Sequence, residues 1–281
     1  MRLAISNIAW NRDEEELVAG LLRELGVRHV EVAPTKRWAA PLDAGPDEVA
    51  EYRRFWERFG ISIVAVQSPL FGRPDLIIFG DDATRRATFE YLSRTVSVAA
   101  QLGASVIVFG SPGNRRAGDV PKERVGAIAE EFFHRLGDVA AGYGVFFCLE
   151  PNPREYGCDF VTTADEGIGL VNRVNSPGFC LHLDAAGMRL AGDDAVEAIP
   201  KAMPILRHFH ISSPFLGPIG AHEVDHVLIA STLRGVGYPH VASIEMKAVS
   251  PGSNVEQVVG AVTFAGRVYG GLQGRGSLSR P

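Results

Sequence analysis

The chain lacks the features that mark secreted, membrane and nucleic-acid-binding proteins. Its 281 residues hold only three cysteines, none in a CxxC pair, so we expect buried, reduced thiols in a cytoplasmic protein. No apolar run approaches the roughly 18–20 residues that span a bilayer, and the start turns acidic before a signal-peptide core could form. With 28 basic and 33 acidic side chains, a net charge of −5, the sequence predicts no surface for nucleic acid.

Short β-rich runs alternate with longer amphipathic stretches along the chain. Eight runs predict strands, and they are Leu3–Ile8, His29–Ala33, Ile61–Gln67, Ser105–Gly110, Val145–Glu150, Phe179–Asp184, Leu206–Ile211 and Val241–Met246. The clearest helical patterns cover Asp13–Leu25, Asp47–Phe59, Asp82–Leu102, Lys122–Gly142 and Val255–Val268. The weakest expected helix lies around Asp193–Met203, where glycine, proline and paired aspartates leave little pattern.

A strand followed by a helix roughly every 35 residues is the cadence of a (β/α)8 TIM barrel. An open doubly wound sheet shares the βαβ pattern. However, the first strand–helix turn lacks GxGxxG, and no GK[ST] phosphate loop occurs, which favours the barrel. We therefore expect a single barrel domain over residues 1–270 and a flexible tail over residues 271–281, which is rich in glycine and serine.

Charged side chains end four consecutive expected strands, at the barrel face where active sites form. They are Glu150, Asp184, His210 and Glu245. Neighbouring strands lie about 4.8 Å apart, so these side chains can converge on one point. One acidic residue at a strand end is commonly a helix N-cap, but three crowded carboxylates repel each other unless a divalent cation lies between them. Oxygen ligands with one nitrogen suit Mn²⁺, Mg²⁺ or Co²⁺ better than structural zinc.

The order of these four residues, with intervals of 34, 26 and 35, resembles the metal quartet of the xylose isomerase-like barrel superfamily. The segments LEPN, HFHIS and VASIEMK around them are similar too. Sugar phosphate isomerases and ketose 3-epimerases belong to this superfamily. The resemblance implies one divalent ion, with Mn²⁺ favoured and Mg²⁺, Co²⁺ or Zn²⁺ as alternatives, and a small carbohydrate-like substrate. It also implies that Glu150 and Glu245 move a proton beside a carbonyl through a cis-enediolate, as in an isomerase or epimerase.

Two positions depart from the ketose 3-epimerase pattern. Those enzymes carry a histidine three residues beyond the metal-binding aspartate and an arginine six beyond the metal-binding histidine, and both hold hydroxyls of the ketose. This chain has Gly187 and Leu216 there, so the resemblance supports the proton transfer more than a particular ketose. A metal-dependent lyase or dehydratase of a keto-sugar or keto-inositol is the alternative at the same site, because the same carbanion can eliminate a β-hydroxyl.

Two further alternatives rest on a motif and on a shared fold. His222–His226 reads HEVDH, the HExxH pattern of metallohydrolases, where it lies inside a helix. Here it follows a Gly/Pro-rich loop, so we predict that Asp225 caps a helix over Val227–Leu233. Endonuclease IV shares the barrel, but its trinuclear zinc site needs histidines where this chain has Gln67, Gly110–Ser111 and Gly187.

Several other side chains near the strand ends are candidates for substrate contact. They are Glu31, Gln67, Asn152, His182, Lys247 and Arg115. Arg115, in the loop after the fourth strand, could receive a phosphate or carboxylate. His182 precedes Asp184 by two residues and so points inward one layer deeper, where support of a metal ligand is expected rather than direct ligation. We expect no nucleic-acid or membrane partner, with a homodimer or homotetramer as candidate assemblies.

Overall fold

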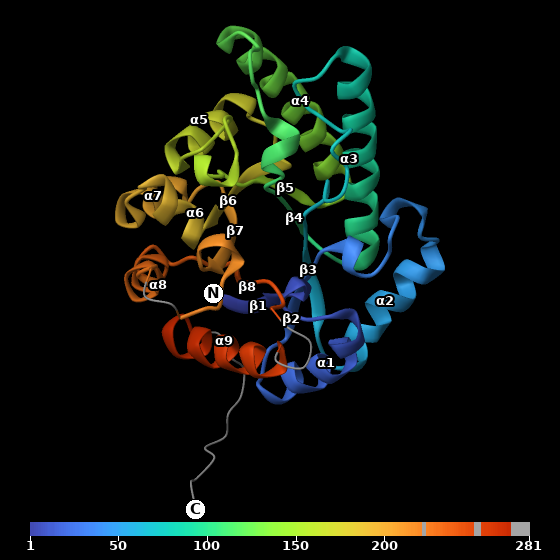
Figure 1. The fold of residues 1–281 in the computed structure, drawn as a ribbon, viewed down its shortest axis with the longest axis vertical. Coiled ribbons are helices and arrows are strands. Elements are labelled where there is room, and N and C mark those ends of the chain that lie inside the picture. The colour runs from blue at the N-terminus through green and yellow to red at the C-terminus, as the bar shows by residue number, and fades with distance from the viewer. Residues whose placement is uncertain (221–222, 250–253, 271–281) are drawn as a thin grey trace, which may run out of the picture.

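Eight parallel strands close into a barrel in the order of the chain, and helices surround it (Figure 1). The computed structural model describes residues 1–220, 223–249 and 254–270. The strands are β1 (Arg2–Ser6), β2 (His29–Val32), β3 (Ser62–Gln67), β4 (Val106–Phe109), β5 (Phe146–Leu149), β6 (Phe179–Asp184), β7 (Leu206–Ser212) and β8 (Val241–Glu245). The predicted single-domain (β/α)8 barrel is therefore confirmed, and the predicted tail 271–281 lies outside the described residues.

The helices on the outer wall follow the predicted pattern with one addition. They are α1 (Glu15–Glu24), α2 (Pro46–Arg58), α3 (Asp82–Leu102), α4 (Lys122–Gly142), α5 (Ala164–Val174), α6 (Ala185–Ala191), α7 (Ala195–Ala202), α8 (His226–Gly235) and α9 (Asn254–Val268). The bounds of α3 agree with the prediction because Asp81 caps its first turn and Gly103 ends it with a φ of 83°. Within the described residues, no helix has both the length and the apolar character needed to cross a bilayer.

The region after β6 forms two short helices where the sequence predicted one weak helix. Gly192 adopts a φ of 76°, a left-handed conformation that ends α6. Two residues later the Asp194 side chain accepts a hydrogen bond from Val196 N (2.8 Å) and starts α7. The sequence did not predict α6, because no loop separates its first residue, Ala185, from the last residue of β6, Asp184.

Buried apolar side chains form a large cluster between the barrel and the helices and a small one inside the barrel. The small cluster consists of Ala65, Val106, Val108, Cys148 and Cys180. Side chains alternate along a strand, so Cys148 and Cys180 share the inward face with Glu150 and Asp184 but lie nearer the amino ends of β5 and β6. All three cysteines of the chain are free and buried, as predicted. The barrel interior is therefore apolar toward one end and ionisable toward the other.

Candidate metal and active site

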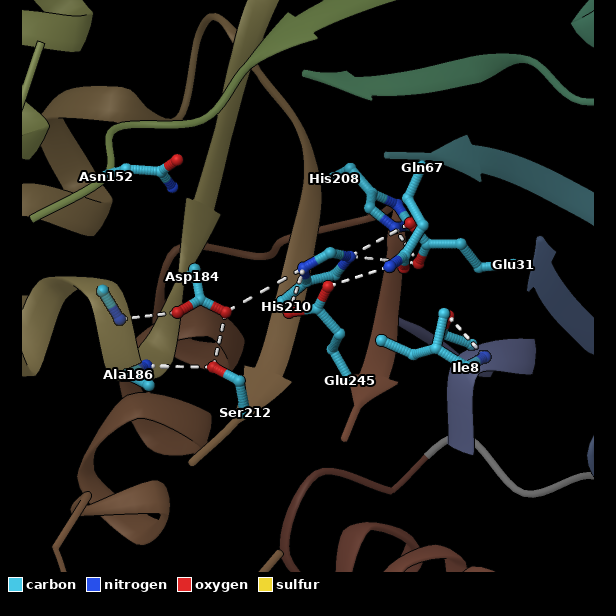
Figure 2. Close-up of polar contacts among 12 residues, drawn as sticks. Ile8, Glu31, Gln67, Asn152, Asp184, Ala186, His208, His210, Ser212 and Glu245 are labelled. Atoms are coloured by element: carbon cyan, nitrogen blue, oxygen red, sulfur yellow. Dashed lines mark hydrogen bonds and ion pairs between the residues drawn. The ribbon is translucent and has the colours of Figure 1, made fainter. Parts of the chain in front are cut away.

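The four predicted strand-end residues lie at the carboxyl ends of neighbouring strands. Glu150 directly follows β5, and its backbone N–H donates to Phe109 O (3.1 Å). Asp184 on β6 pairs in register with His210 on β7, and Glu245 on β8 pairs with Ser212, two residues beyond His210. Figure 2 shows Asp184, His210 and Glu245 pointing toward one another. This parallel register brings together side chains that are 61 residues apart in the chain (184 to 245).

His210 lies at the centre of this group, and its ring is fixed from below. Its Nε2 is 3.1 Å from both carboxylate oxygens of Glu31, which also contacts His208 Nε2 (3.0 Å) (Figure 2). Its Nδ1 therefore faces the other carboxylates, 3.3 Å from Glu245 Oε2 and 3.9 Å from Asp184 Oδ2. This nitrogen is buried, and no residue in the described part of the chain forms a hydrogen bond with it. A carboxylate that holds one imidazole nitrogen and leaves the other free is the usual support of a metal-binding histidine.

The two flanking carboxylates are also held in place. Gln67 Nε2 donates to Glu245 Oε1 (2.9 Å). Ser212 Oγ and Gly187 N donate to the two oxygens of Asp184, which also caps α6. Asp184 therefore has two roles: it is the N-cap of α6, and it belongs to the cluster of ionisable side chains.

Ligand atoms of Glu150, His182, Asp184 and His210 lie within 4.8 Å of one another. Glu245 approaches this group through its contact with His210 Nδ1. Carboxylate oxygens around an unpartnered, buried imidazole nitrogen are a donor set that fits a divalent cation. The residues present therefore agree with the expected metal.

The crowding of these carboxylates changes their acidity. Burial, with the negative charges of Asp184 and Glu245, raises the pKa of Glu150 to about 8. Burial and the charge of Glu245 raise the pKa of Asp184 to about 6. Burial alone would lower the pKa of His210, but the Glu31 and Glu245 carboxylates raise it well above its ordinary value. Without a cation, part of this cluster holds protons at neutral pH, and a bound cation favours the ionised carboxylates.

A cavity of about 420 Å³ opens over the cluster. Its walls include the predicted residues Gln67, Asn152, Lys247, Glu150, Asp184 and Glu245, together with Tyr156, Ser212, Phe215 and Leu216. This volume lies in the ordinary range for small-molecule sites, roughly 300–1,000 Å³. A larger hollow of about 650 Å³ lies against α1 and α2 on the outer wall, away from the clustered ligand atoms. The sequence did not predict Tyr156 as a cavity residue. It lies in a turn after β5, where no periodic pattern shows which way a side chain points.

Two predicted substrate contacts, Glu31 and Arg115, are not among the described residues that line the cavity. Glu31 is fully buried, and its carboxylate contacts the rings of His208 and His210. It therefore orients both histidines. Arg115 is also fully buried. Its guanidinium donates to four backbone carbonyls, those of Gly110, Glu150, Phe160 and Val161. Arg115 therefore braces the loops after β4 and β5.

His182 is the third predicted contact outside the cavity wall. It is fully buried on β6, with its ring centroid 4.1 Å from that of His210. Burial, together with the positive charges of His210 and His208, lowers the pKa of His182 well below its ordinary value. Neither of its ring nitrogens has a hydrogen-bond partner among the described residues. Its imidazole is therefore neutral and presents a free lone pair.

The described part of the HEVDH segment, residues 223–226, is a loop-to-helix junction, as predicted. Asp225 accepts a hydrogen bond from Leu228 N (2.9 Å) and caps α8, which begins only at His226. Glu223 precedes the helix, and His226 Nδ1 contacts the Tyr269 hydroxyl (2.8 Å). His222 lies outside the described residues. The helical zinc motif of a metallohydrolase is therefore not formed by the described part of this segment.

Comparisons with known proteins agree with the fold. The model of the family described as xylose isomerase-like TIM barrel matches residues 19–262. The L-ribulose 3-epimerase of Methylomonas sp. (strain DH-1) is 25% identical over 240 residues, which cover 82% of this chain and 79% of the relative. Among solved structures, a D-psicose 3-epimerase in the presence of D-fructose superposes with a TM-score of 0.80 and 22% identity, over 96% of this chain and 100% of that one. The IOLI protein with a bound zinc atom has a TM-score of 0.74 and 19% identity, over 98% and 100% of the two chains.

Proposed function

The chain belongs to the xylose isomerase-like TIM-barrel family, and on that premise we propose that it is a divalent-metal-dependent isomerase or epimerase of a sugar-like hydroxy-ketone. The names of its relatives, a ribulose 3-epimerase and a ketose 3-epimerase of Arthrobacter globiformis, support an epimerase. The cavity volume supports a small substrate.

The observation that carries this proposal is the pair Glu150 and Glu245 in one cavity wall. They come from β5 and β8, with Asp184 and His210 on the two strands between them. To invert or shift a hydrogen beside a carbonyl, one group must remove the proton and another must return a proton elsewhere. One glutamate takes the proton from the carbon, leaving an enediolate, and the carboxyl of the other donates a proton to the opposite face or to the neighbouring carbon.

Glu150, Asp184, His210 and Glu245 would hold the cation. When bound, a divalent cation neutralises the crowded carboxylates and stabilises negative charge on the substrate oxygen. The chain's own residues keep the geometry: Glu31 fixes the His210 ring, and Gln67 fixes Glu245.

The free polar atoms of the wall support a hydroxylated substrate. Gln67 Oε1 and Asn152 Oδ1 are buried acceptors without a partner among the described residues, so each can accept a hydrogen bond from a substrate hydroxyl. Leu216 adds an apolar surface where ketose 3-epimerases carry an arginine. Gly187 cannot be replaced by a longer residue without displacing a neighbour, because an added Cβ would lie 3.2 Å from Asp184 Oδ1. The hydroxyl contacts therefore differ from those of the free-ketose enzymes.

Exchange of the α-proton with solvent tests this function without knowledge of the true substrate. The metal-loaded protein is incubated in D₂O with ketoses, ketose phosphates and keto-inositols, and proton NMR follows each α-carbon. We expect enzyme-dependent deuteration, or a new epimer, for at least one of these compounds. A vinylic signal with ultraviolet absorbance would instead identify the dehydratase. No exchange with any compound at full metal occupancy would contradict the proposal.

A further inference from the structure

His182 is a buried polar residue whose hydrogen-bonding capacity is unused. Its side chain is fully buried on β6, and both Nδ1 and Nε2 lack a partner among the described residues. Buried polar groups in folded proteins are almost always hydrogen-bonded, because water has been lost without replacement. A plain core position in the barrel would be occupied at lower cost by leucine. The position therefore calls for a ligand of the imidazole.

The protein groups around His182 do not supply that ligand. Its neighbours in the layer below the cavity are the His208 and His210 rings, with centroids 5.4 and 4.1 Å away. The Nε2 atoms of both rings are already engaged by Glu31. The three histidines also lie close enough to form a cluster of their own, but only His182 among them has both nitrogens free.

The free atoms nearest to His182 belong to the cavity cluster. One atom each from Glu150, His182, Asp184 and His210 lies within 4.8 Å of the others, although His182 is one layer deeper than Asp184. His210 contributes Nδ1, the nitrogen that Glu31 leaves unpartnered. A ligand held between these atoms would bind a nitrogen of His182 and Nδ1 of His210 at once.

We propose that His182 is an additional nitrogen ligand of the metal centre, which gives this chain a site with two imidazoles and carboxylates. The inference rests on the proposed function for the centre itself. His182 would add a second nitrogen to the four expected ligands, among which only His210 offers one. The added nitrogen changes the expected metal. A second imidazole favours Zn²⁺ or Co²⁺ over Mn²⁺ and Mg²⁺, which prefer oxygen ligands.

The test compares His182→Leu with Cys180→Ala, an interior control two residues earlier on the same face of β6. Zn²⁺ and Mn²⁺ affinities are measured by chelator competition, and the Co²⁺-loaded proteins are compared by visible absorption. We expect His182→Leu to lower Zn²⁺ affinity by roughly 10- to 100-fold, to lower Mn²⁺ affinity less, and to weaken the Co²⁺ bands. Cys180→Ala should leave all three unchanged.

Thermal unfolding of the metal-free proteins separates ligation from a structural role. Removing two unsatisfied nitrogens should leave the Tm of metal-free His182→Leu equal to or above that of the wild type. An unchanged ratio of Zn²⁺ to Mn²⁺ affinity would overturn the assignment. A lower metal-free Tm with equal losses for both ions would also overturn it, because that result describes a core histidine.

A variant-free measurement covers the case in which His182→Leu does not fold. X-ray absorption of the zinc-loaded wild-type protein counts imidazole ligands, and we expect two; one would overturn the assignment. Asp184→Asn keeps this inference distinct from the proposed function. If that variant loses zinc while His182→Leu retains it, the metal centre stands and the His182 ligand does not.

Discussion

The two ends of the barrel interior are built from the same strands but from opposite chemistry. Toward the amino ends, Val106, Cys148 and Cys180 pack against one another in a small apolar cluster. Toward the carboxyl ends, β5 and β6 present Glu150 and Asp184. Burial raises the pKa of both carboxyls, and so does repulsion, from Asp184 and Glu245 for Glu150 and from Glu245 for Asp184. The apolar end stabilises the fold by itself, whereas the ionisable end is costly until a cation binds. This division agrees with the general barrel plan of stability at one face and chemistry at the other.

The largest effect should come from removing one ligand at the ionisable end. Protein purified without chelator should contain about one divalent ion per chain, and Asp184→Asn should lose it, because the amide does not carry the charge that holds the cation. Elemental analysis measures this. The control at the apolar end is Val106→Ala, which should lower the free energy of unfolding by roughly 1–3 kcal/mol and keep the ion. If Asp184→Asn kept a full complement of the ion, the ionisable end of the barrel would not be the metal-binding end.

The residue that supports His210 from below should have the next largest effect. Glu31→Gln keeps the shape of the side chain but removes the charge that fixes Nε2 of His210 and His208. We expect metal affinity to fall roughly 10- to 100-fold, the usual scale for a carboxylate behind a metal-binding histidine. Chelator competition gives the value. An affinity equal to that of the wild type would mean that Glu31 serves only packing.

A glycine pair tests whether the position of Glu150 matters. A Cβ on Gly110 would overlap Glu150 Oε2, whereas a Cβ on Gly113 would meet nothing within 4 Å. Gly110→Ala should displace the carboxylate and reduce kcat by roughly 10-fold or more, since small misplacements of a reacting group are costly. Gly113→Ala is the matched control and should change little. Equal kcat values for the two variants would show that the cavity tolerates a moved Glu150.

The smallest effect is a change in the pH dependence of stability. The raised pKa values, about 8 for Glu150 against 4.5 ordinarily and about 6 for Asp184 against 3.8, mean that these two carboxyls hold more protons in the folded metal-free protein than in the unfolded chain. Their contribution to its stability should therefore fall as pH rises from about 4 to 8. A bound cation reverses this, so the Tm gained on adding metal should grow over the same range. Thermal unfolding with and without metal at several pH values measures the difference, and a constant gain would contradict it.

The sequence predicted the parts of the molecule that depend on periodicity and strand order. The barrel follows from eight strand–helix units, and the side chains that end β5 to β8 follow from the alternation of each strand. The direction of loop side chains could not be predicted: Arg115 turns inward onto backbone carbonyls, and Tyr156 turns into the cavity. Nor could alternation give the depth to which a side chain reaches. His182 was expected to support the site from a deeper layer. One of its ring nitrogens nevertheless lies within 4.8 Å of ligand atoms of Glu150, Asp184 and His210.

We propose that Glu150 and Glu245 exchange a proton with one substrate from two positions in the cavity. The most direct test follows α-deuteration and turnover in D₂O for the wild type, Glu150→Gln and Glu245→Gln, all compared at full metal occupancy. Each variant should slow exchange or turnover by roughly 10²-fold or more, the usual scale for a lost general base. Exchange that persists in only one variant, without turnover, would identify the other glutamate as the abstracting base. Wild-type rates in both variants would contradict the account.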